Sequence, residues 1–303
     1  MTSDSLNRFF GQGRPTPGGP PVANTRIEHP PSLQVVFDAI PELDADALTL
    51  ALRSYHSELA AASAEFFASP RTAEPGDEGV PPDIYGLFGW GRHVVKLIGF
   101  NSPMPKEVVE TCVRPAHYED EVKQLAYTHT AHAILYYAGY DGDPLEQYVA
   151  VAAVAGCLAR FGAVAVLNET AHTSVPAIVL LPDEADDLDI LTAIRGLPLP
   201  FLFAGFVKLE IEEEPGVWMR TYGAHVLGLP DLALRAEGHH QGTFAFHAFA
   251  NMLAYLRESG KSFIPGDSMQ VGERTFFTLR ERTEAEWYLE SDGEMLVCER
   301  SET

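Results

Sequence analysis

One segment constrains the fold more than any other: the segment from Asp143 to Gly162 follows a helical pattern that is apolar on nearly every side. Asp143 can cap its first turn, Pro144 suits the first helical position and Gly162 lies just past its end. Its longest apolar run is shorter than the roughly 18 residues that a membrane span needs. A helix of this kind must be covered by protein on all sides. We therefore expect at least two layers around it, and expect the helix to join two halves of the molecule.

The segments before this helix alternate between strand and helix patterns. An apolar stripe from Leu48 to Phe66 predicts one long helix. Short helices are expected at 105–111 and 118–126, strands at 33–37, 84–88, 93–100 and 130–137, and a Pro/Gly-rich surface loop at 69–82. This order predicts a ferredoxin-like βαββαβ lobe over residues 32–140.

The remainder, residues 141–303, predicts a second α+β lobe that packs on the first or continues it as one domain. Strands are expected at 163–167, 201–211, 217–227, 275–280, 287–289 and 295–298, and helices at 188–195 and 242–259. The predicted fold class is α+β, with mixed, largely antiparallel sheets and packed helices.

Residues 1–31 are rich in proline and glycine. Such a composition offers little apolar surface to offset the entropy of ordering the chain. We expect a disordered tail that is dispensable for folding.

The charge narrows the choice of partner. The chain carries 43 acidic and 21 basic side chains, a formal net charge of −22. This charge repels phosphate backbones and anionic lipid headgroups, so we expect neither nucleic-acid nor membrane binding. A basic protein partner is compatible with it. The oligomeric state is left open.

The common signatures of cofactor-dependent enzymes do not occur. The sequence has no G-x-G-x-x-G after a strand, no complete phosphate-binding loop, no G-x-S-x-G and no H-E-x-x-H. The three cysteines are far apart and suggest neither disulfides nor a zinc knuckle. We therefore expect no cofactor, and reduced thiols in a cytoplasmic protein without a signal peptide.

The 11 histidines invite a metal hypothesis. His129 and His132 are an odd number of residues apart, so on a strand they point to opposite faces. His240 and His247 on one helix would lie about two turns, roughly 10 Å, apart. A site made by His225, His239 and His240 stays open as an alternative. Scattered histidines more commonly serve as hydrogen-bonding groups, which is the reading we favour.

Four short motifs resemble the bacterial family called domain of unknown function 4261. They are Pro103-Met104-Pro105 after a strand, Ala131-His132 opening an apolar strand, the helix at 143–162, and the last helix followed by Gly266-Asp267. The resemblance covers residues 90–285 and implies an α+β fold in a bacterial cytosol. It points to His132, Glu237 and Asp267 as binding positions.

Trp218, in an aromatic strand, is a further binding candidate, although a lone tryptophan usually fills a core. Proteins of this kind look similar to immunity or regulatory binding modules. Our first hypothesis is therefore a non-catalytic acidic protein-binding module. The alternative is a metal-assisted hydrolase that uses clustered histidines with Glu237 or Asp267 as base.

Overall fold

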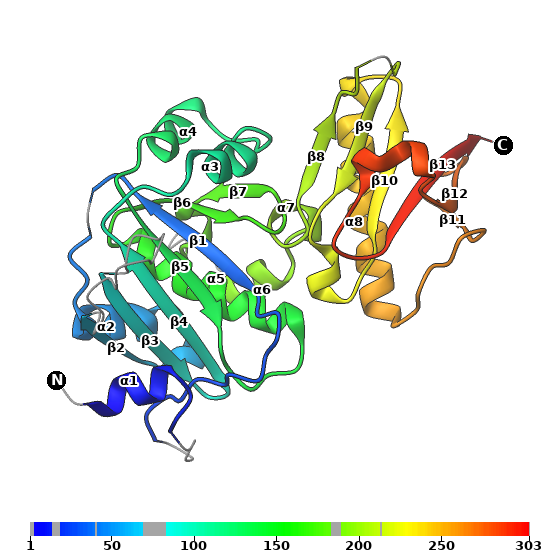
Figure 1. Cartoon of the computed structure of the whole chain (residues 1–303). Helices are drawn as coiled ribbons and strands as arrows, with labels where there is room; N and C mark the ends of the chain where they lie inside the picture. The colour runs from blue at the N-terminus through cyan, green and yellow to red at the C-terminus, as the bar shows by residue number, and fades with distance from the viewer. Residues whose placement is uncertain are drawn as a thin grey trace. The chain divides into compact units, whose positions relative to one another are not determined.

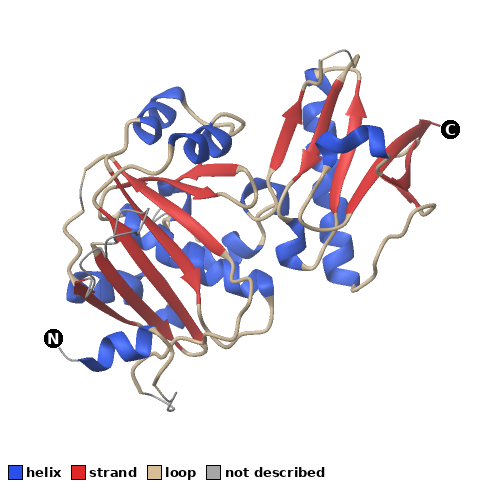
Figure 2. Cartoon of the chain, in the orientation of Figure 1, coloured by secondary structure: helices blue, strands red, loops and turns tan. Residues whose placement is uncertain are grey.

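The chain forms two compact units, each with its own sheet (Figure 1). The computed structural model describes residues 3–13, 19–39, 41–68, 83–182, 189–212 and 214–302. Unit 1 comprises Met1–Leu167 and Ser174–Gly196, and unit 2 comprises Asn168–Thr173 and Leu197–Thr303. Helices pack on both sheets, which are mostly antiparallel (Figure 2). The predicted α+β class is confirmed.

Unit 1 is built on a seven-stranded sheet in the order β2-β3-β4-β5-β1-β6-β7. Each pairing from β2 to β6 in this order is antiparallel. The strands are β1 (Ser32–Phe37), β2 (Ser63–Ala68), β3 (Ile84–Trp90), β4 (His93–Phe100), β5 (Ala131–Tyr137), β6 (Ala163–Asn168) and β7 (Thr173–Pro176).

Helices cover both faces of this sheet. They are α1 (Ser3–Phe9), α2 (Ala45–Tyr55), α3 (Lys106–Val113), α4 (Asp120–Tyr127), α5 (Pro144–Ala159) and α6 (Ile190–Arg195), with short 3-10 turns η1 (Ser57–Leu59) and η2 (Ala177–Leu180). The apolar helix α5 packs on β1, β4 and β5 and is itself covered by α2, α6 and η2. It is buried as predicted. It lies within unit 1, however, and does not join the two halves.

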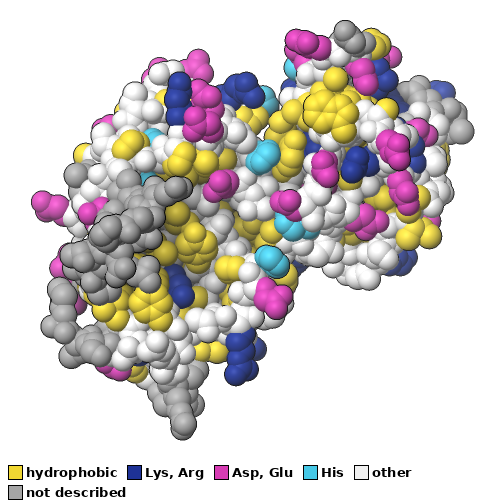
Figure 3. Space-filling model, in the orientation of Figure 1, with side chains coloured by type: hydrophobic (Ala, Val, Ile, Leu, Met, Phe, Trp, Pro, Cys, Tyr) yellow, Lys and Arg dark blue, Asp and Glu magenta, His cyan; other side chains and the backbone are white. Residues whose placement is uncertain are grey.

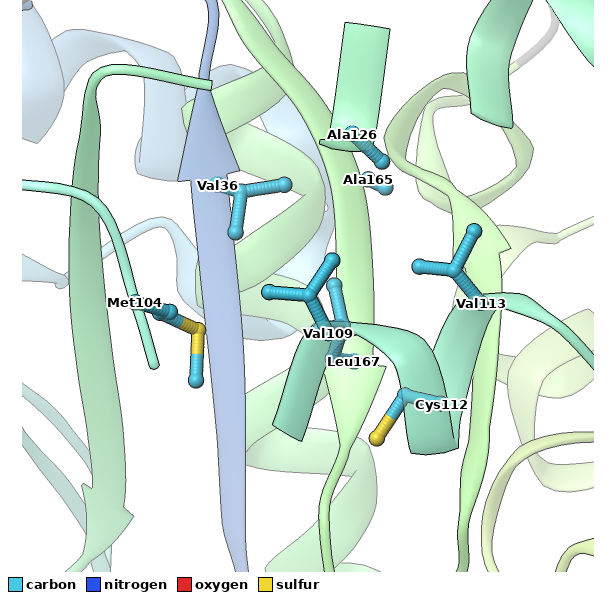
Figure 4. Packing of buried hydrophobic residues seen from close by; sticks show 8 residues of the cluster. All are labelled: Val36, Met104, Val109, Cys112, Val113, Ala126, Ala165 and Leu167. Atoms are coloured by element: carbon cyan, nitrogen blue, oxygen red, sulfur yellow. The ribbon is translucent and has the colours of Figure 1, made fainter. Parts of the chain in front are cut away.

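On the opposite face, α3 and α4 close one part of the core (Figure 4). Val109, Cys112 and Val113 of α3 pack with Val36 of β1 and Leu167 of β6. Val36 lies opposite His132, which lies opposite Phe100 of β4, so these three side chains share this face. The even-numbered residues of β4 therefore point to the side that α3 and α4 partly cover.

The same face is covered elsewhere by α1, which corrects the prediction of a disordered tail over residues 1–31. Among the described residues of that segment, Phe9, Val22 and Ala23 are buried. Phe9 and Ala23 join a cluster with Tyr85 and Leu87 of β3. A few well-placed apolar side chains are enough to order this segment, despite its proline and glycine content.

The ferredoxin-like arrangement is wrong in its strand order. It would place β1 between the strands at 93–100 and 130–137, but these strands, β4 and β5, pair directly and antiparallel. The predicted long helix is also wrong: α2 ends at Tyr55, and residues 63–68 form strand β2. Pairing with β3 outweighs the helical spacing there. The predicted loop at 69–82 lies outside the described residues.

Unit 2 is built on a six-stranded sheet in the order β11-β12-β13-β10-β9-β8. Its pairs are antiparallel except for the parallel pair β10–β13. The strands are β8 (Phe206–Leu209), β9 (Val217–Thr221), β10 (Asp231–Ala236), β11 (Ser268–Gln270), β12 (Thr275–Glu281) and β13 (Met295–Glu302). The helices are α7 (Leu199–Leu202) and α8 (Gly242–Ser259), with 3-10 turns η3 (Ala224–Leu227), η4 (His239–Gln241) and η5 (Glu284–Leu289).

The predicted elements of unit 2 need several corrections. The strand expected at 217–227 ends at Thr221 and is followed by the 3-10 turn η3, and strand β11 was not predicted. Residues 287–289 lie in η5, because Thr283 and Glu286 form a capping box that starts a helical turn. The first part of the strand expected at 201–211 is α7, and strand β10 was not predicted. The boundary between the units lies near residue 196 instead of residue 140. Among the described helices, none is long and apolar enough to cross a membrane.

Candidate functional site

A polar pocket of about 580 Å³ opens in unit 2. This volume is in the range of ligand sites in proteins, roughly 300–1,000 Å³. Three short segments line it, namely residues 169–172, 222–225 and 290–292. The lining side chains are those of Glu169, Thr170, His172, Tyr222, His225, Glu290, Ser291 and Asp292.

The first wall is the turn between β6 and β7. Asn168 holds it from within, because its side chain accepts a hydrogen bond from Ala171 N (3.2 Å) and donates one to Leu202 O (2.9 Å). His172 has a φ of +50°, and it is the one residue other than glycine with a positive φ in the described part of the chain. Left-handed backbone at a bulky residue is a form of strain that concentrates at functional sites.

The second wall follows β9 and turns through Gly223, whose φ is +83°. A Cβ at this position would lie 3.0 Å from Thr170 O, so glycine allows the two walls to approach closely. The ring of Tyr222 lies 4.1 Å from that of His172 between centroids. The two rings therefore lie against each other, which ties the first wall to the second.

The third wall, residues 290–292, is fixed by two fully buried ionisable side chains, Arg220 and Asp231. Arg220 donates from Nη1 to Tyr288 O (3.2 Å) and Glu290 O (3.1 Å). Its guanidinium carbon lies 3.7 Å from the centroid of the Tyr222 ring. Ser291 Oγ donates to Asp231 Oδ2.

Asp231 also ties this wall to the second one. Its Oδ1 accepts hydrogen bonds from Thr221 Oγ1 (3.0 Å) and Ala224 N (3.2 Å). Because the two buried side chains bind backbone and hydroxyl groups from both walls, the pocket is held in one shape before any ligand arrives.

His225 packs tightly at the junction of these walls. A Cβ at Gly293 would lie 2.4 Å from the His225 Cβ, so only glycine permits this approach. His225 Nδ1 is buried and has no hydrogen-bond partner within the described residues. Unsatisfied polar atoms are rare in native proteins and call for an explanation such as a functional role.

The charges at the pocket are predominantly negative. Glu169, Glu290 and Asp292 line it, whereas lysine and arginine are absent from the described lining. Burial lowers the pKa of His172, and the nearby Arg220 lowers it further. His172 is therefore neutral at pH 7 and does not offset the three carboxylates.

The predicted binding residue His132 lies in unit 1, where it has a structural role. Its Nδ1 donates to Ser102 O (2.7 Å), and its ring stacks on Phe100 with centroids 4.7 Å apart. His129 donates from Nδ1 to Ala126 O (2.7 Å) and accepts from Met104 N at Nε2 (2.7 Å). His129 precedes β5, so the opposite-face expectation was wrong: both histidines reach the backbone at 102–104.

The other predicted binding residues do not gather in unit 2. Trp218 is buried in the core with Leu289 and Val297, as is usual for a lone tryptophan in a strand. Glu237 is exposed after β10. The Asp267 carboxylate accepts from Ile264 N (3.0 Å) and so closes a turn. None of the three lines the pocket.

The three candidate metal ligands are also separate. His225 lines the pocket, but His239 and His240 do not. His239 Nε2 lies 2.7 Å from Glu210 Oε1 on an exposed surface. Across the described ranges, no three His, Cys, Asp or Glu side chains are arranged to hold a metal ion.

Sequence reasoning missed His172, Tyr222, Arg220 and Asp231. Arg220 and Asp231 did carry a signal, because a charged residue among apolar residues of a strand pattern indicates a buried group with a specific partner. No family model, curated protein or solved structure matches the chain. The resemblance to domain of unknown function 4261 stays a prediction.

Proposed function

We propose that the protein is a non-catalytic acidic binding module, and that the unit 2 pocket receives an arginine or lysine side chain of a basic protein partner. One observation carries the proposal: three carboxylates and two aromatic rings line the pocket, and the described lining holds no basic side chain. Carboxylates bind guanidinium groups through short charge-assisted hydrogen bonds.

The net charge of the chain supports the same partner. A formal charge of −22 raises the encounter rate with a basic protein and disfavours partners that carry phosphate. Arg220 lies behind the lining with its guanidinium bound to backbone carbonyl groups, and the equally buried Asp231 carboxylate opposes its charge, so the lining keeps its excess of carboxylates.

The rigidity of the pocket supports binding as well. Its third wall is held by Arg220 and by the Ser291–Asp231 hydrogen bond. A preorganised site binds without paying an ordering cost. The hydrolase alternative has less support, because His239 and His240 lie away from the pocket that His225 lines.

The test is titration calorimetry with a blocked hexa-arginine peptide, with a hexa-glutamine peptide as the neutral control. The double variant Glu290→Gln/Asp292→Asn removes two carboxylates of the pocket. Glu258→Gln, at an exposed position of α8, combined with Glu299→Gln on β13 removes the same charge elsewhere. We expect the pocket variant to bind hexa-arginine about tenfold more weakly, about 1.4 kcal/mol. The control should bind within about twofold of the native protein.

Two results would contradict the proposal. Equal losses in both double variants would mean that only the overall charge attracts the peptide. The absence of saturable binding by the native protein at low salt would mean that the pocket does not receive a basic side chain.

A further inference from the structure

A second pocket, of about 390 Å³, lies in unit 1 beside α1. It lies on the face of the sheet that α1 covers in part, where hydrophobic side chains gather in Figure 3. Phe9, Phe10, Ile27, Pro30 and Ile98 give it an apolar lining, with Tyr136 on the neighbouring strand. The described lining contains one charged side chain, that of Lys96.

Lys96 is placed at the centre of this face by strand register. It lies on β4 directly opposite Tyr136 of β5, and two residues from Ile98 on the same side. Its ammonium group lies 4.6 Å from the centroid of the Phe9 ring. Because α1 brings Phe9 over the strand, the lysine is enclosed on one side by an aromatic ring.

Lys96 has no charged partner among the described residues, although the chain is strongly acidic. Within the described residues its ammonium group makes neither an ion pair nor a hydrogen bond, and no carboxylate lines the pocket. Burial lowers the pKa of Lys96 below its ordinary value. A cation that loses solvation without a counter-ion costs stability, so a structural role does not account for it.

We propose that this pocket binds a small amphipathic carboxylate, whose anionic head pairs with Lys96 and whose apolar body lies against Phe9, Phe10, Ile27 and Ile98. The head would give Lys96 a counter-charge, which the described residues do not supply. The apolar body would remove the exposed part of Phe10, which is 47% accessible, from water. The Thr25 hydroxyl, at the exposed rim of the pocket, is a second donor within the same site.

The proposal is tested by titrating octanoate and its neutral isostere octanamide into the full chain. We expect saturable octanoate binding, with octanamide at least about tenfold weaker. Lys96→Met should abolish octanoate binding, whereas Lys96→Arg should retain it. Lys106→Met is the matched control, because the Lys106 side chain is 81% exposed on α3, and it should bind octanoate like the native protein.

Melting temperature separates loss of binding from loss of folding. Lys96→Met removes a desolvated charge from an apolar site, so the variant should melt at or above the native temperature while losing the ligand. Phe10→Ala should weaken octanoate binding several-fold with only a small fall in melting temperature, because the Phe10 ring is half exposed.

Three outcomes would overturn the proposal. The first is the absence of saturable octanoate binding by the native protein at millimolar concentration, and the second is octanamide binding as tight as that of octanoate. Unchanged octanoate binding in Lys96→Met would exclude the lysine as the anchor. These results are independent of the hexa-arginine titration, which concerns unit 2 only.

Discussion

The two units each hold a cation away from water, and they do so in opposite ways. Arg220 of unit 2 is fully buried, donates to three backbone carbonyl oxygens and lies on the Tyr222 ring. Lys96 of unit 1 is half-buried over the Phe9 ring, without an acceptor among the described residues. The difference indicates that Arg220 builds the wall of a site, whereas Lys96 is available to a ligand.

The chemistry of the two side chains fits this division. A planar guanidinium can satisfy several fixed carbonyl groups at once, whereas an ammonium on a flexible stem is a point charge that adapts to a ligand. The pockets are complementary in sign as well. Carboxylates line the pocket of unit 2, and a single lysine marks the pocket of unit 1.

The largest effect that we expect comes from Arg220→Ala, which should destabilise unit 2 by about 4 kcal/mol. The substitution leaves Tyr288 O and Glu290 O unpaired in the interior and removes a large buried side chain. Urea unfolding followed by tryptophan fluorescence measures it in a Trp90→Phe background, because Trp218 and Trp287 both lie in unit 2.

Arg235→Ala is the matched control for this prediction. Arg235 also donates to a backbone carbonyl, Pro215 O, but its side chain is 44% exposed. Removal of the Arg235 side chain should lower the free energy of unfolding by less than about 1 kcal/mol. Equal costs for the two substitutions would refute the view that burial makes Arg220 a structural cation.

Phe9→Ala should destabilise unit 1 by a somewhat smaller amount, about 3 kcal/mol. The reason is that Phe9 is 2% exposed and fills the cluster beneath α1. Phe10→Ala, at the adjacent residue, should cost under about 1 kcal/mol because the ring is half exposed. Urea unfolding of both variants tests whether α1 is part of the core. Native stability in Phe9→Ala would restore the prediction of a dispensable tail.

The sequence predicted the positions of helices and strands better than it predicted which strands pair with each other. The helix α5 and the strands expected at 84–88 and 93–100 were predictable, because an all-round apolar pattern and short apolar runs are local signals. The strand order was not, because β4 pairs with β5 through contacts between residues 32 to 42 positions apart in the chain.

The candidate site escaped prediction for a related reason. Its walls come from three separate segments, and each lining residue has an ordinary local explanation. Histidine spacing drew attention to His129 and His132, which bind backbone groups, whereas His172 stands alone in the sequence beside a threonine. The burial of Lys96 depends on α1, in a segment that composition marked as disordered.

Glycine substitutions test how closely the walls of the unit 2 pocket must approach. Gly223→Ala should cost about 2 kcal/mol, since alanine disfavours a left-handed backbone and its Cβ would lie 3.0 Å from Thr170 O. Gly228 is also left-handed, with a φ of +71°, but has open space around it, so Gly228→Ala should cost about 1 kcal/mol. Comparison of the two urea midpoints isolates the wall contact, and identical midpoints would show that the walls can separate freely.

A change of pH should have the smallest effect on stability per residue. This effect should differ between the two units. Burial lowers the pKa of His93, His129 and His132 in unit 1, and of His172 in unit 2. The unfolded chain takes up these protons near pH 6.5, whereas the folded chain takes them up only at lower pH. Stability is therefore complete above about pH 6.5 and is lost as the pH falls through the lowered folded pKa values. Unit 1, with three such histidines, should lose more stability on acidification than unit 2.

His129 gives this prediction its sharpest form, because its two ring nitrogens are committed to Ala126 O and Met104 N and only the neutral ring can serve both. His129→Gln removes the titrating group, so the loss of stability between pH 7.5 and 5.5 should be smaller than in the native protein. His29→Gln, at an exposed position, should leave that loss unchanged. Urea midpoints at the two pH values, read from Trp90 for unit 1 in a Trp218→Phe/Trp287→Phe background, provide the measurement. If His129→Gln lost as much stability as the native protein, the buried neutral ring would not be a source of the acid sensitivity.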